Sequence, residues 1–358
     1  MLTKKLMIKN LHRPDWSKPQ KRFSNRLWLD KNELFLDDNF NEFKKILQKI
    51  KPYNLSSYPD LSYLYKQLRN HLKINVDQLI LTNGSDGGIR MVFDLLTNQK
   101  DKVLILNPTF AMYEIYCKIF KLKYRKINFK FSDKGPKLSL NEICDEIRKY
   151  RPKLFCIPNP NSPTGTIFKI EEIKKILRIS KKAKTFVLVD EAYYPISKIT
   201  VKSLIKNFDN LIIVRSFSKS MGLAGLRVGY ILTNNKLTLQ FHKIKSMYEI
   251  GNFQAEILSL ILKSKLSKKN SINKIINDKK YFKQKLKNYG FKTLNDQGNF
   301  IHVDFGKQRF KIFKKLEKIM YFRKLETHPC LKNFSRISLT SKENYNKILN
   351  IIKNEKNI

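Results

Sequence analysis

A polar segment that follows an apolar run carries the residues best suited to chemistry. Residues 211–214 are apolar, which predicts a buried strand, and Ser216, Ser218 and Lys219 follow it directly. In open α/β sheets, ligands bind beyond the carboxyl ends of the strands. The two hydroxyls and the nearby Arg227 are donors suited to a phosphate group, and the amine of Lys219 can form a Schiff base. The segment therefore predicts a reactive lysine beside a phosphate site.

A second apolar run, about thirty residues upstream, supplies a carboxylate and a phenol. Residues 185–194 read T-F-V-L-V-D-E-A-Y-Y, so Asp190 ends a predicted buried strand and Tyr193 follows it. A lysine imine needs an electron sink, and pyridoxal phosphate is one when a carboxylate keeps its ring nitrogen protonated. Lys219, Asp190 and the phosphate donors together indicate a pyridoxal-phosphate site. This prediction requires Lys219 and Asp190 to reach the same cofactor ring from neighbouring strand ends.

The lysine segment and further blocks in order resemble the fold-type I pyridoxal-phosphate enzymes, the aspartate aminotransferase superfamily. Within it, the chain is most similar to the histidinol-phosphate aminotransferase-like branch. The blocks are S-F-S-K-S-M-G-L-A-G-L-R-V-G-Y at 216–230, N-G-S-D at 83–86, N-P-T-F-A-M-Y at 107–113, N-P-N-S-P-T-G at 159–165, D-E-A-Y at 190–193 and R-I-S at 336–338. Residues 28–33, W-L-D-K-N-E, resemble the N-terminal substrate-side segment of that family. The blocks cover most of the chain, and several follow predicted strands, so a chance match is improbable.

The resemblance implies a role for each candidate residue. It implies a homodimer in which Tyr58 reaches the phosphate of the neighbouring subunit's cofactor. Residues 84–86 also open a predicted helix, where unpaired amides favour phosphate, although Ser and Asp are common helix caps as well. In the family pattern, the residues that hold the phosphate correspond to Gly84, Ser85, Asp86, Ser216, Ser218 and Arg227. Those that hold the cofactor ring correspond to Phe110, Asp190, Tyr193 and Lys219. Arg336 and Arg323 correspond to the residues that bind the substrate.

The chain departs from the family pattern at two positions of the predicted site. Gly87 stands where the family usually has an acidic residue, and Ser162 stands where an asparagine normally hydrogen-bonds the phenolic oxygen of the cofactor. Asn159 or Asn161 could supply that amide instead, or Ser162 and Tyr193 could share its task. At Arg336 the pattern is kept, and bidentate binding of a carboxylate requires the planar fork of arginine. By direct count the sequence holds 14 arginines among 72 basic residues, so an arginine at this position favours function over a surface charge.

Composition indicates a globular protein with an unusual charge. The 358 residues carry a net charge of +42, which in isolation would suggest a nucleic acid or an anionic membrane as partner. The lysines are spread along the whole chain, however, so we expect no nucleic-acid partner. No apolar run approaches 18 residues, so we expect no membrane span. The five histidines have no metal-like spacing, and the four scattered cysteines indicate neither zinc nor disulfides, so we expect no metal and a cytoplasmic location.

The pattern of elements predicts an α/β fold with a mostly parallel central sheet in a large domain and a smaller α+β domain. We expect strands at 79–82, 102–106, 153–157, 185–190 and 211–214, and later ones at 300–303 and 336–339. Helices are expected at 39–51, 61–68, 89–96, 138–150, 171–180 and 344–353, and along 236–265 with an interruption at 251–253 that approaches a partner's site. The division is an N-terminal arm with part of the small domain at 1–50, a large cofactor-binding domain at 51–240, and a connecting helix with the C-terminal small domain at 241–358. Residues 1–22, basic and proline-containing, read as an extended arm.

The predicted reaction is a two-stage transamination. Lys219 would hold the cofactor, be displaced by an amino donor such as glutamate, and then move the proton between the substrate and the cofactor, while Tyr193 hydrogen-bonds the phenolate oxygen. The amino group would pass to a 2-oxo acid or a phosphorylated carbonyl compound. One alternative is a decarboxylase or lyase of the same fold, similar to threonine-phosphate decarboxylases, because a fold does not decide a reaction. Another is a polyanion-binding protein without catalysis, which would show no cofactor spectrum.

Overall fold

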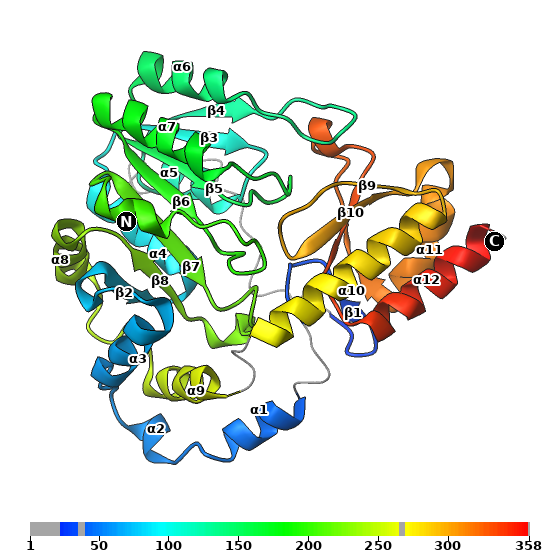
Figure 1. The fold of residues 1–358 in the computed structure, drawn as a ribbon, viewed down its shortest axis with the longest axis horizontal. Helices are drawn as coiled ribbons and strands as arrows, with labels where there is room; N and C mark the ends of the chain where they lie inside the picture. The colour runs from blue at the N-terminus through cyan, green and yellow to red at the C-terminus, as the bar shows by residue number, and fades with distance from the viewer. Residues whose placement is uncertain (1–21, 35–39, 265–268, 357–358) are drawn as a thin grey trace, which may run out of the picture.

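The computed structural model describes residues 22–34, 40–264 and 269–356. The arm expected at 1–22 lies outside the described residues, apart from Arg22. Two sheets with their helices stand side by side in the molecule, with the larger sheet on the left and the smaller one on the right of Figure 1.

The larger sheet is seven-stranded and mostly parallel, as predicted. Its order is β2-β8-β7-β6-β5-β3-β4, and among these strands only β8 runs antiparallel to its neighbours. Its strands are β2 (Leu79–Thr82), β3 (Lys102–Asn107), β4 (Lys123–Asn128), β5 (Leu154–Pro158), β6 (Phe186–Asp190), β7 (Leu211–Ser216) and β8 (Gly229–Leu232). Because β5, β6 and β7 are adjacent and parallel, their carboxyl ends meet at one edge, which places Asp190 and the residues after Ser216 close together.

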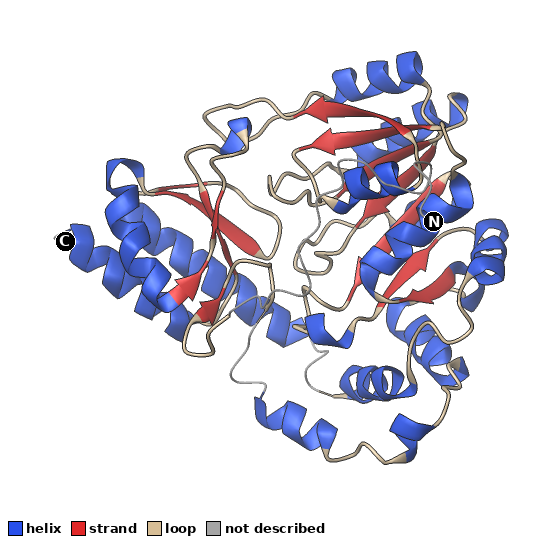
Figure 2. Ribbon diagram, turned by 180° about the vertical axis from the view of Figure 1, so that it is seen from behind, coloured by secondary structure: helices blue, strands red, loops and turns tan. Residues whose placement is uncertain are grey.

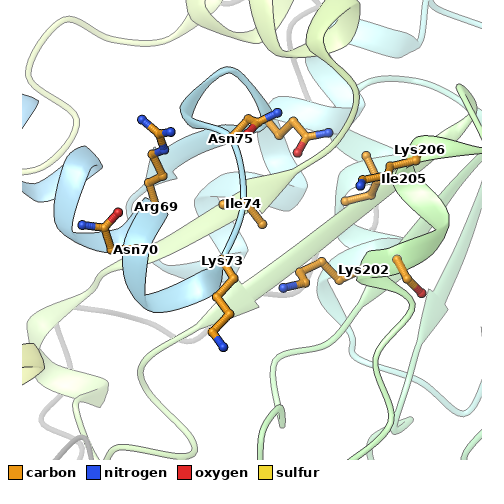
Figure 3. Close-up of a pocket in the computed structure, with 10 residues that line it drawn as sticks. Arg69, Asn70, Lys73, Ile74, Asn75, Lys202, Ile205 and Lys206 are labelled. Atoms are coloured by element: carbon orange, nitrogen blue, oxygen red, sulfur yellow. The ribbon is translucent and has the colours of Figure 1, made fainter.

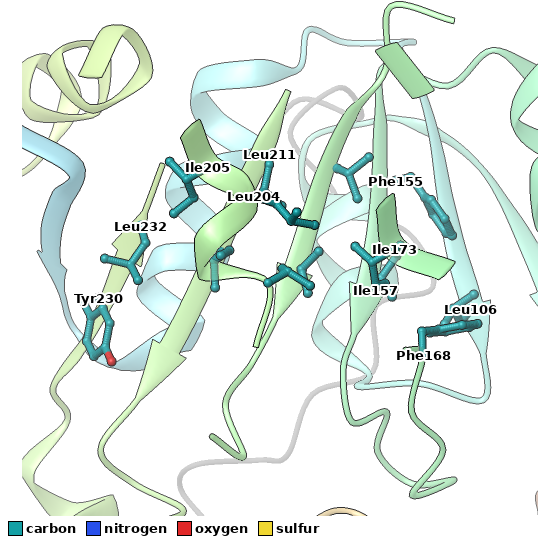
Figure 4. Close-up of a cluster of buried hydrophobic side chains, with 14 of the residues drawn as sticks. Leu106, Phe155, Ile157, Phe168, Ile173, Leu204, Ile205, Leu211, Tyr230 and Leu232 are labelled. Carbon is teal, nitrogen blue, oxygen red and sulfur yellow. The ribbon is translucent and has the colours of Figure 1, made fainter. Parts of the chain in front are cut away.

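Helices cover both faces of this sheet, which explains why its central strands are apolar along their whole length. On one face lie α1 (Phe40–Leu47), α2 (Tyr53–Ser56), α3 (Ser62–Leu72), α6 (Leu140–Tyr150), α7 (Ile170–Lys182) and α9 (Asn252–Lys263), with the 3₁₀ turns η2 (Val76–Gln78) and η3 (Lys202–Lys206) nearby. Leu106, Phe155, Ile157 and Leu211 are among the side chains packed on this face (Figure 4). On the other face lie α4 (Gly84–Leu96), α5 (Met112–Ile119) and α8 (Asn235–Ile244), packed on the alternate residues of the same strands. The fold is therefore a three-layered α/β structure.

The smaller sheet is antiparallel and packs against three helices, which are seen from behind in Figure 2. Its order is β12-β13-β10-β9, and a separate pair, β1-β11, joins the N-terminal segment to it. The elements are β1 (Leu27–Trp28), β9 (Lys292–Thr293), β10 (Phe300–Asp304), β11 (Met320–Tyr321), β12 (Arg323–Lys324) and β13 (Ser335–Ser338), with α10 (Lys269–Asn288), α11 (Arg309–Ile319) and α12 (Lys342–Lys356). The remaining 3₁₀ turns are η4 (Ala224–Leu226), η6 (Gly306–Gln308) and η7 (Pro329–Leu331).

The helical run expected along 236–265 is divided differently from the prediction. The break covers the residues between α8 and α9, and Gly251 caps the start of α9 instead of interrupting a helix. The backbone N–H of Gly251 donates to Gln254 Oε1 at 2.7 Å, so this glycine begins the helix. Helix α9 packs against α2 and α3, on the side of the large sheet. The division into domains at 50 and 240 remains a prediction.

Candidate active site

A cavity of about 210 Å³ lies between the carboxyl edge of the large sheet and the small sheet. Residues predicted from different parts of the sequence meet on its wall: Ser85, Phe110, Ser162, Asp190, Tyr193, Lys219 and Arg336. The amine and the carboxylate on which the sequence prediction depends therefore face one space.

Asp190 is the last residue of β6, and the residue is buried, with 6% of its surface exposed. Its Oδ2 accepts from the Tyr113 hydroxyl and its Oδ1 from the Ala192 amide, both at 2.9 Å. Burial raises the pKa of Asp190 to about 6, although these two donors act in the opposite direction. A buried carboxylate without a cationic partner among the described residues fits a protonated ring nitrogen as its missing partner.

Lys219 follows β7 and turns its amine toward the N-terminal segment, where Nζ donates to the backbone carbonyl of Lys31 at 2.9 Å. Burial lowers the pKa of Lys219 to about 8; the guanidinium groups of Arg336 and Arg227 act in the same direction, whereas Glu33 and Asp190 oppose it. The amine is therefore neutral in a useful fraction of molecules near neutral pH, as a Schiff-base lysine requires.

Donors from three segments form a cradle next to the lysine. The Ser216 hydroxyl donates to Ser218 Oγ at 2.8 Å, and both side chains are buried. Gly84 begins α4 with φ of 68°, and a Cβ built there would lie 2.7 Å from the Arg227 guanidinium. A side chain at Gly84 would displace that guanidinium from the helix N-terminus. Amides at a helix start, two hydroxyls and a guanidinium fit a phosphate group.

The other predicted phosphate contacts differ in character. The Asp86 carboxylate accepts from the Tyr116 hydroxyl at 2.9 Å, so the group that Asp86 can offer to a phosphate is its backbone N–H. Glu249 fills the space beside Gly87, where its Oε1 lies 3.4 Å from the position of a Cβ. An acidic side chain from the segment between α8 and α9 therefore lies beside position 87, where the family pattern usually has an acidic residue.

The two asparagines considered as replacements for the family amide are engaged elsewhere. Asn159 exchanges two hydrogen bonds with the backbone of Phe168, and Asn161 donates to Pro108 O and to Thr164 Oγ1. Both are buried, and neither lines the cavity. Ser162 does line it, so the geometry favours the option in which Ser162 and Tyr193 share the task.

Arg336 stands on β13 with its guanidinium held by two acceptors. Its NH1 donates to Ser162 Oγ at 3.1 Å and its NH2 to Asp30 O at 3.0 Å, whereas the buried Nε has no partner among the described residues. Burial lowers the pKa of Arg336. Arg323 lies directly opposite on β12, and its Nε also donates to Asp30 O, at 3.3 Å. Two guanidiniums therefore stand side by side, which suits an anionic group of a substrate.

Phe110 and Tyr58 lie at the margins of the site. Phe110 lines the cavity with 37% of its surface exposed, and its ring meets Tyr113 edge to face. Tyr58 is 77% exposed and stacks on Tyr248 at 4.2 Å between ring centroids. It does not line the cavity of its own chain, so its predicted role requires a second subunit.

Sequence reasoning assigned no role to several residues that complete the site. Asn32 and Asn299 contact Tyr193 and the Lys219 backbone, and Tyr113 bonds Asp190. The sequence marks residues 28–33 only as a block that resembles the family, and position 299 precedes a strand without any local signal. Position 113 lies in the 107–113 block, so this tyrosine was the one detectable candidate.

A second cavity, of about 620 Å³, lies between α3 and η3, away from these residues (Figure 3). It is lined by Arg69, Lys73, Lys202 and Lys206 among others. Lys202 Nζ donates to Leu72 O at the end of α3, and cations at the C-terminus of a helix commonly serve such a structural role. Within the described residues, no group of three or more histidine, cysteine, aspartate or glutamate side chains is arranged to hold a metal ion.

The fold and the site define a pyridoxal-phosphate enzyme of fold type I. A family model described as aminotransferase class I and II matches residues 26–352, and the chain belongs to this family. Histidinol-phosphate aminotransferase from Clostridium novyi (strain NT) is 31% identical over 333 residues, which cover 92% of each chain. The protein is therefore a pyridoxal-phosphate-dependent aminotransferase.

Solved structures share the fold at lower identity. The histidinol-phosphate aminotransferase from Sinorhizobium meliloti, in complex with pyridoxal 5′-phosphate, has a TM-score of 0.77 at 19% identity and covers 92% of this chain and 91% of its own. The L-threonine-O-3-phosphate decarboxylase from Porphyromonas gingivalis has a TM-score of 0.73 at 19% identity, with 92% and 98% covered. Enzymes of two reaction types thus share this fold, so the fold alone does not decide the reaction, and the aminotransferase assignment rests on the family match and the 31% identical relative.

Proposed function

We propose that the enzyme exchanges an amino group between glutamate and a phosphorylated carbonyl compound of the histidinol-phosphate type. The observation that carries this proposal is the pair of arginines directly opposite each other on β12 and β13: Arg336 lines the cavity, and Arg323 donates to the same Asp30 carbonyl as Arg336 does. One substrate of such an exchange carries carboxylates and the other a phosphate. Arginine forks accept either anion.

The protein's own groups divide the work at the reacting centre. Pyridoxal phosphate, when bound, supplies the electron sink. Asp190 offers a buried carboxylate to a cation at the base of the cavity. Lys219 Nζ, neutral above its lowered pKa of about 8, would accept the α-proton of the amino donor in the first half of the exchange and give a proton to the α-carbon of the acceptor in the second half. The Ser216, Ser218 and Arg227 donors retain the phosphate while substrates exchange.

The proposal is tested by comparing two substrates on one preparation. With L-histidinol phosphate and 2-oxoglutarate we expect glutamate formation. With L-threonine phosphate we expect no carbon dioxide above background. Carbon dioxide release from threonine phosphate without glutamate formation from histidinol phosphate would favour the decarboxylase alternative. Glutamate formation from aromatic or aliphatic amino acids, but not from histidinol phosphate, would leave an aminotransferase with a different substrate.

We further propose that the enzyme works as a homodimer in the cytoplasm. Five large apolar or aromatic side chains are exposed on α2, just after it, and between α8 and α9: Tyr53, Leu55, Tyr58, Met247 and Tyr248. Exposed apolar side chains of this kind are often covered by a partner subunit. Cys117, Cys144, Cys156 and Cys330 are free and buried, which supports a reducing compartment. No helix in the described part of the chain has both the length and the apolarity needed to span a bilayer. Sedimentation velocity of the purified protein would test the dimer.

A further inference from the structure

The segment of residues 29–34, here termed the strap, runs from β1 across the cavity. Three consecutive strap residues each contact a residue of the candidate site. The carbonyl of Asp30 accepts from Arg336, and the carbonyl of Lys31 accepts from Lys219. The third contact is made by a side chain: Asn32 Nδ2 donates to the Tyr193 hydroxyl at 2.8 Å. Asn32 therefore differs from its neighbours, because its contact depends on residue type.

The backbone of Asn32 is fixed by the small sheet. Its N–H donates to Ser338 Oγ at 2.9 Å, and its carbonyl accepts from Asn299 Nδ2 at 2.7 Å. Its φ is 55°, a left-handed conformation that asparagine tolerates better than most residues, and it is 4% exposed. The backbone is thus held in place while the side-chain nitrogen donates to Tyr193, and the amide oxygen, Asn32 Oδ1, is buried without a hydrogen-bond partner among the described residues.

The hydrogen bonds around Tyr193 fix the direction of its own proton. A phenol has one donor and two acceptor positions. Asn32 Nδ2 fills one acceptor position. Ser162 Oγ accepts from Arg336 NH1 at 3.1 Å, and Ser162 lines the same cavity as Tyr193. Because the Asn32 amide donates to the phenol oxygen, the Tyr193 O–H is left to donate in another direction, and Tyr193 lines the cavity beside Lys219 and Asp190.

We propose that Asn32 is a positioning residue that acts through Tyr193: its amide occupies the phenol oxygen so that the phenol proton is donated to the phenolic oxygen of the bound cofactor. A donor to an oxygen anion stabilises the deprotonated form, which lowers the pKa of the group that carries it. Asn32 therefore keeps the lysine-bound cofactor in its reactive protonation state to a lower pH. This inference rests on the proposed binding of the cofactor at Lys219, but it does not depend on the identity of the substrate. A failed test of Asn32 would therefore leave the proposed substrate untouched, and a different substrate would leave the role of Asn32 untouched.

The test is a pH titration of the absorbance of the lysine-bound cofactor in four proteins. Asn32→Gly removes the amide and keeps the left-handed backbone, and Asn32→Asp keeps the shape but offers only acceptors. Each variant is compared with the natural sequence. Lys184→Gly is the matched control: the backbone of Lys184 is also left-handed, with φ of 57°, but this residue lies before β6, at the amino edge of the sheet and away from the cavity. We expect the titration midpoint to rise by about half a pH unit or more in Asn32→Gly, and further in Asn32→Asp because a negative charge is added. The control should not move it.

A double-mutant cycle separates positioning from a structural effect. In a Tyr193→Phe background, Asn32→Gly should leave the titration midpoint unchanged, because the group through which Asn32 acts is gone. The same upward shift in both backgrounds would overturn the inference, and so would an unchanged midpoint when Asn32→Gly is made in the natural sequence. If Asn32→Gly fails to fold, Asn32→Asp replaces it, and the two shifts are then compared: the added charge raises the midpoint in both backgrounds, but the rise should be larger when Tyr193 is present. Equal rises in the two backgrounds would overturn the inference.

Discussion

The two walls of the cavity are built in opposite ways. The sheet wall consists of Asp190 at the end of β6 and the Ser216–Lys219 segment after β7, and each group is placed by the apolar strand that precedes it. The opposite wall consists of the strap and of side chains from the small sheet. Its contacts join residues far apart in the chain: 161 positions from Asn32 to Tyr193, 188 from Lys31 to Lys219, and 306 from Asn32 to Ser338.

This difference separates two kinds of task. The sheet wall holds groups whose burial shifts their pKa, raising it for Asp190 and lowering it for Lys219. The strap wall mainly offers backbone carbonyls and amides that orient those groups and Arg336. We therefore expect changes on the sheet wall to abolish chemistry, and changes on the strap wall to tune it. The predictions below test that division.

The largest effect is expected from Lys219→Ala. Without the amine, no covalent link to the cofactor forms and no base serves the α-proton, so the absorbance band of the lysine-bound cofactor should vanish and turnover should fall by at least about 10³-fold. Lys182→Ala, an exposed lysine at the end of α7, is the control and should keep both. An intact band in Lys219→Ala would show that another amine holds the cofactor.

A smaller but still large loss is expected from Asp190→Asn. Losing the carboxylate removes a charge that is aimed at the reacting centre, and turnover should drop by roughly 10² to 10³-fold. Circular dichroism should show an unchanged fold. Turnover within a few-fold of the natural enzyme would mean that the partner of Asp190 is not the cofactor.

The same variant tests the cost of the buried carboxylate. Burial raises the pKa of Asp190 from 3.8 to about 6, so the folded protein binds its proton more tightly than the unfolded chain does. Between these two pH values the folded state carries more protons, and its free energy of unfolding must therefore fall as pH rises. Relative to Asp190→Asn, the cofactor-free natural protein should lose about 3 kcal/mol in total as pH rises, most of it between pH 4 and pH 7, and the two proteins should differ by a constant amount below about pH 3. Urea denaturation of both proteins across this range measures the difference.

The sheet wall of the cavity could be predicted from the sequence better than the strap wall. β6 and β7 are buried on both faces, so a short apolar run was enough to locate them and the polar residues behind them. The break between α8 and α9 was misplaced because Gly251 reads as a helix interruption, although in the structure it caps α9. A single glycine in a helical pattern does not say on which side the helix lies.

The strap wall left almost no local signal. Asn32 looks like any polar residue in a loop, and its importance depends on Ser338 and Asn299, which a window of neighbouring residues cannot contain. The roles of Asn159 and Asn161 were equally undetermined, since the sequence shows two amides beside the site but not the backbone groups of Phe168 and Pro108 that bind them. Composition and periodicity predict elements, whereas the hydrogen-bond partner of a buried amide is decided by tertiary packing.

On the strap side, Arg336→Lys should weaken substrate binding and leave the cofactor untouched. Lysine cannot hold Ser162, Asp30 and an anion together in the way that a planar fork does, so KM should rise about 10 to 100-fold. The absorbance band should be unchanged. Arg323→Lys is the matched comparison: its side chain is 53% exposed, and we expect a rise in KM of only a few-fold. Equal effects of the two variants would mean that the substrate anion lies between the guanidiniums and not on Arg336.

The smallest effect is expected from Tyr58→Phe, which tests whether a second copy of the chain adds a third wall. The stack on Tyr248 needs only the ring and should survive, so any loss reports on the hydroxyl. If that hydroxyl donates to the phosphate of a neighbouring subunit's cofactor, the cofactor dissociation constant should rise about fivefold, as expected for one hydrogen bond. Tyr248→Phe keeps the same stack and should leave the constant unchanged. Because the contact crosses subunits, the difference in cofactor dissociation constant between the natural protein and Tyr58→Phe should shrink as dilution separates the dimer. A difference that does not depend on protein concentration would mean that the Tyr58 hydroxyl acts within a single chain.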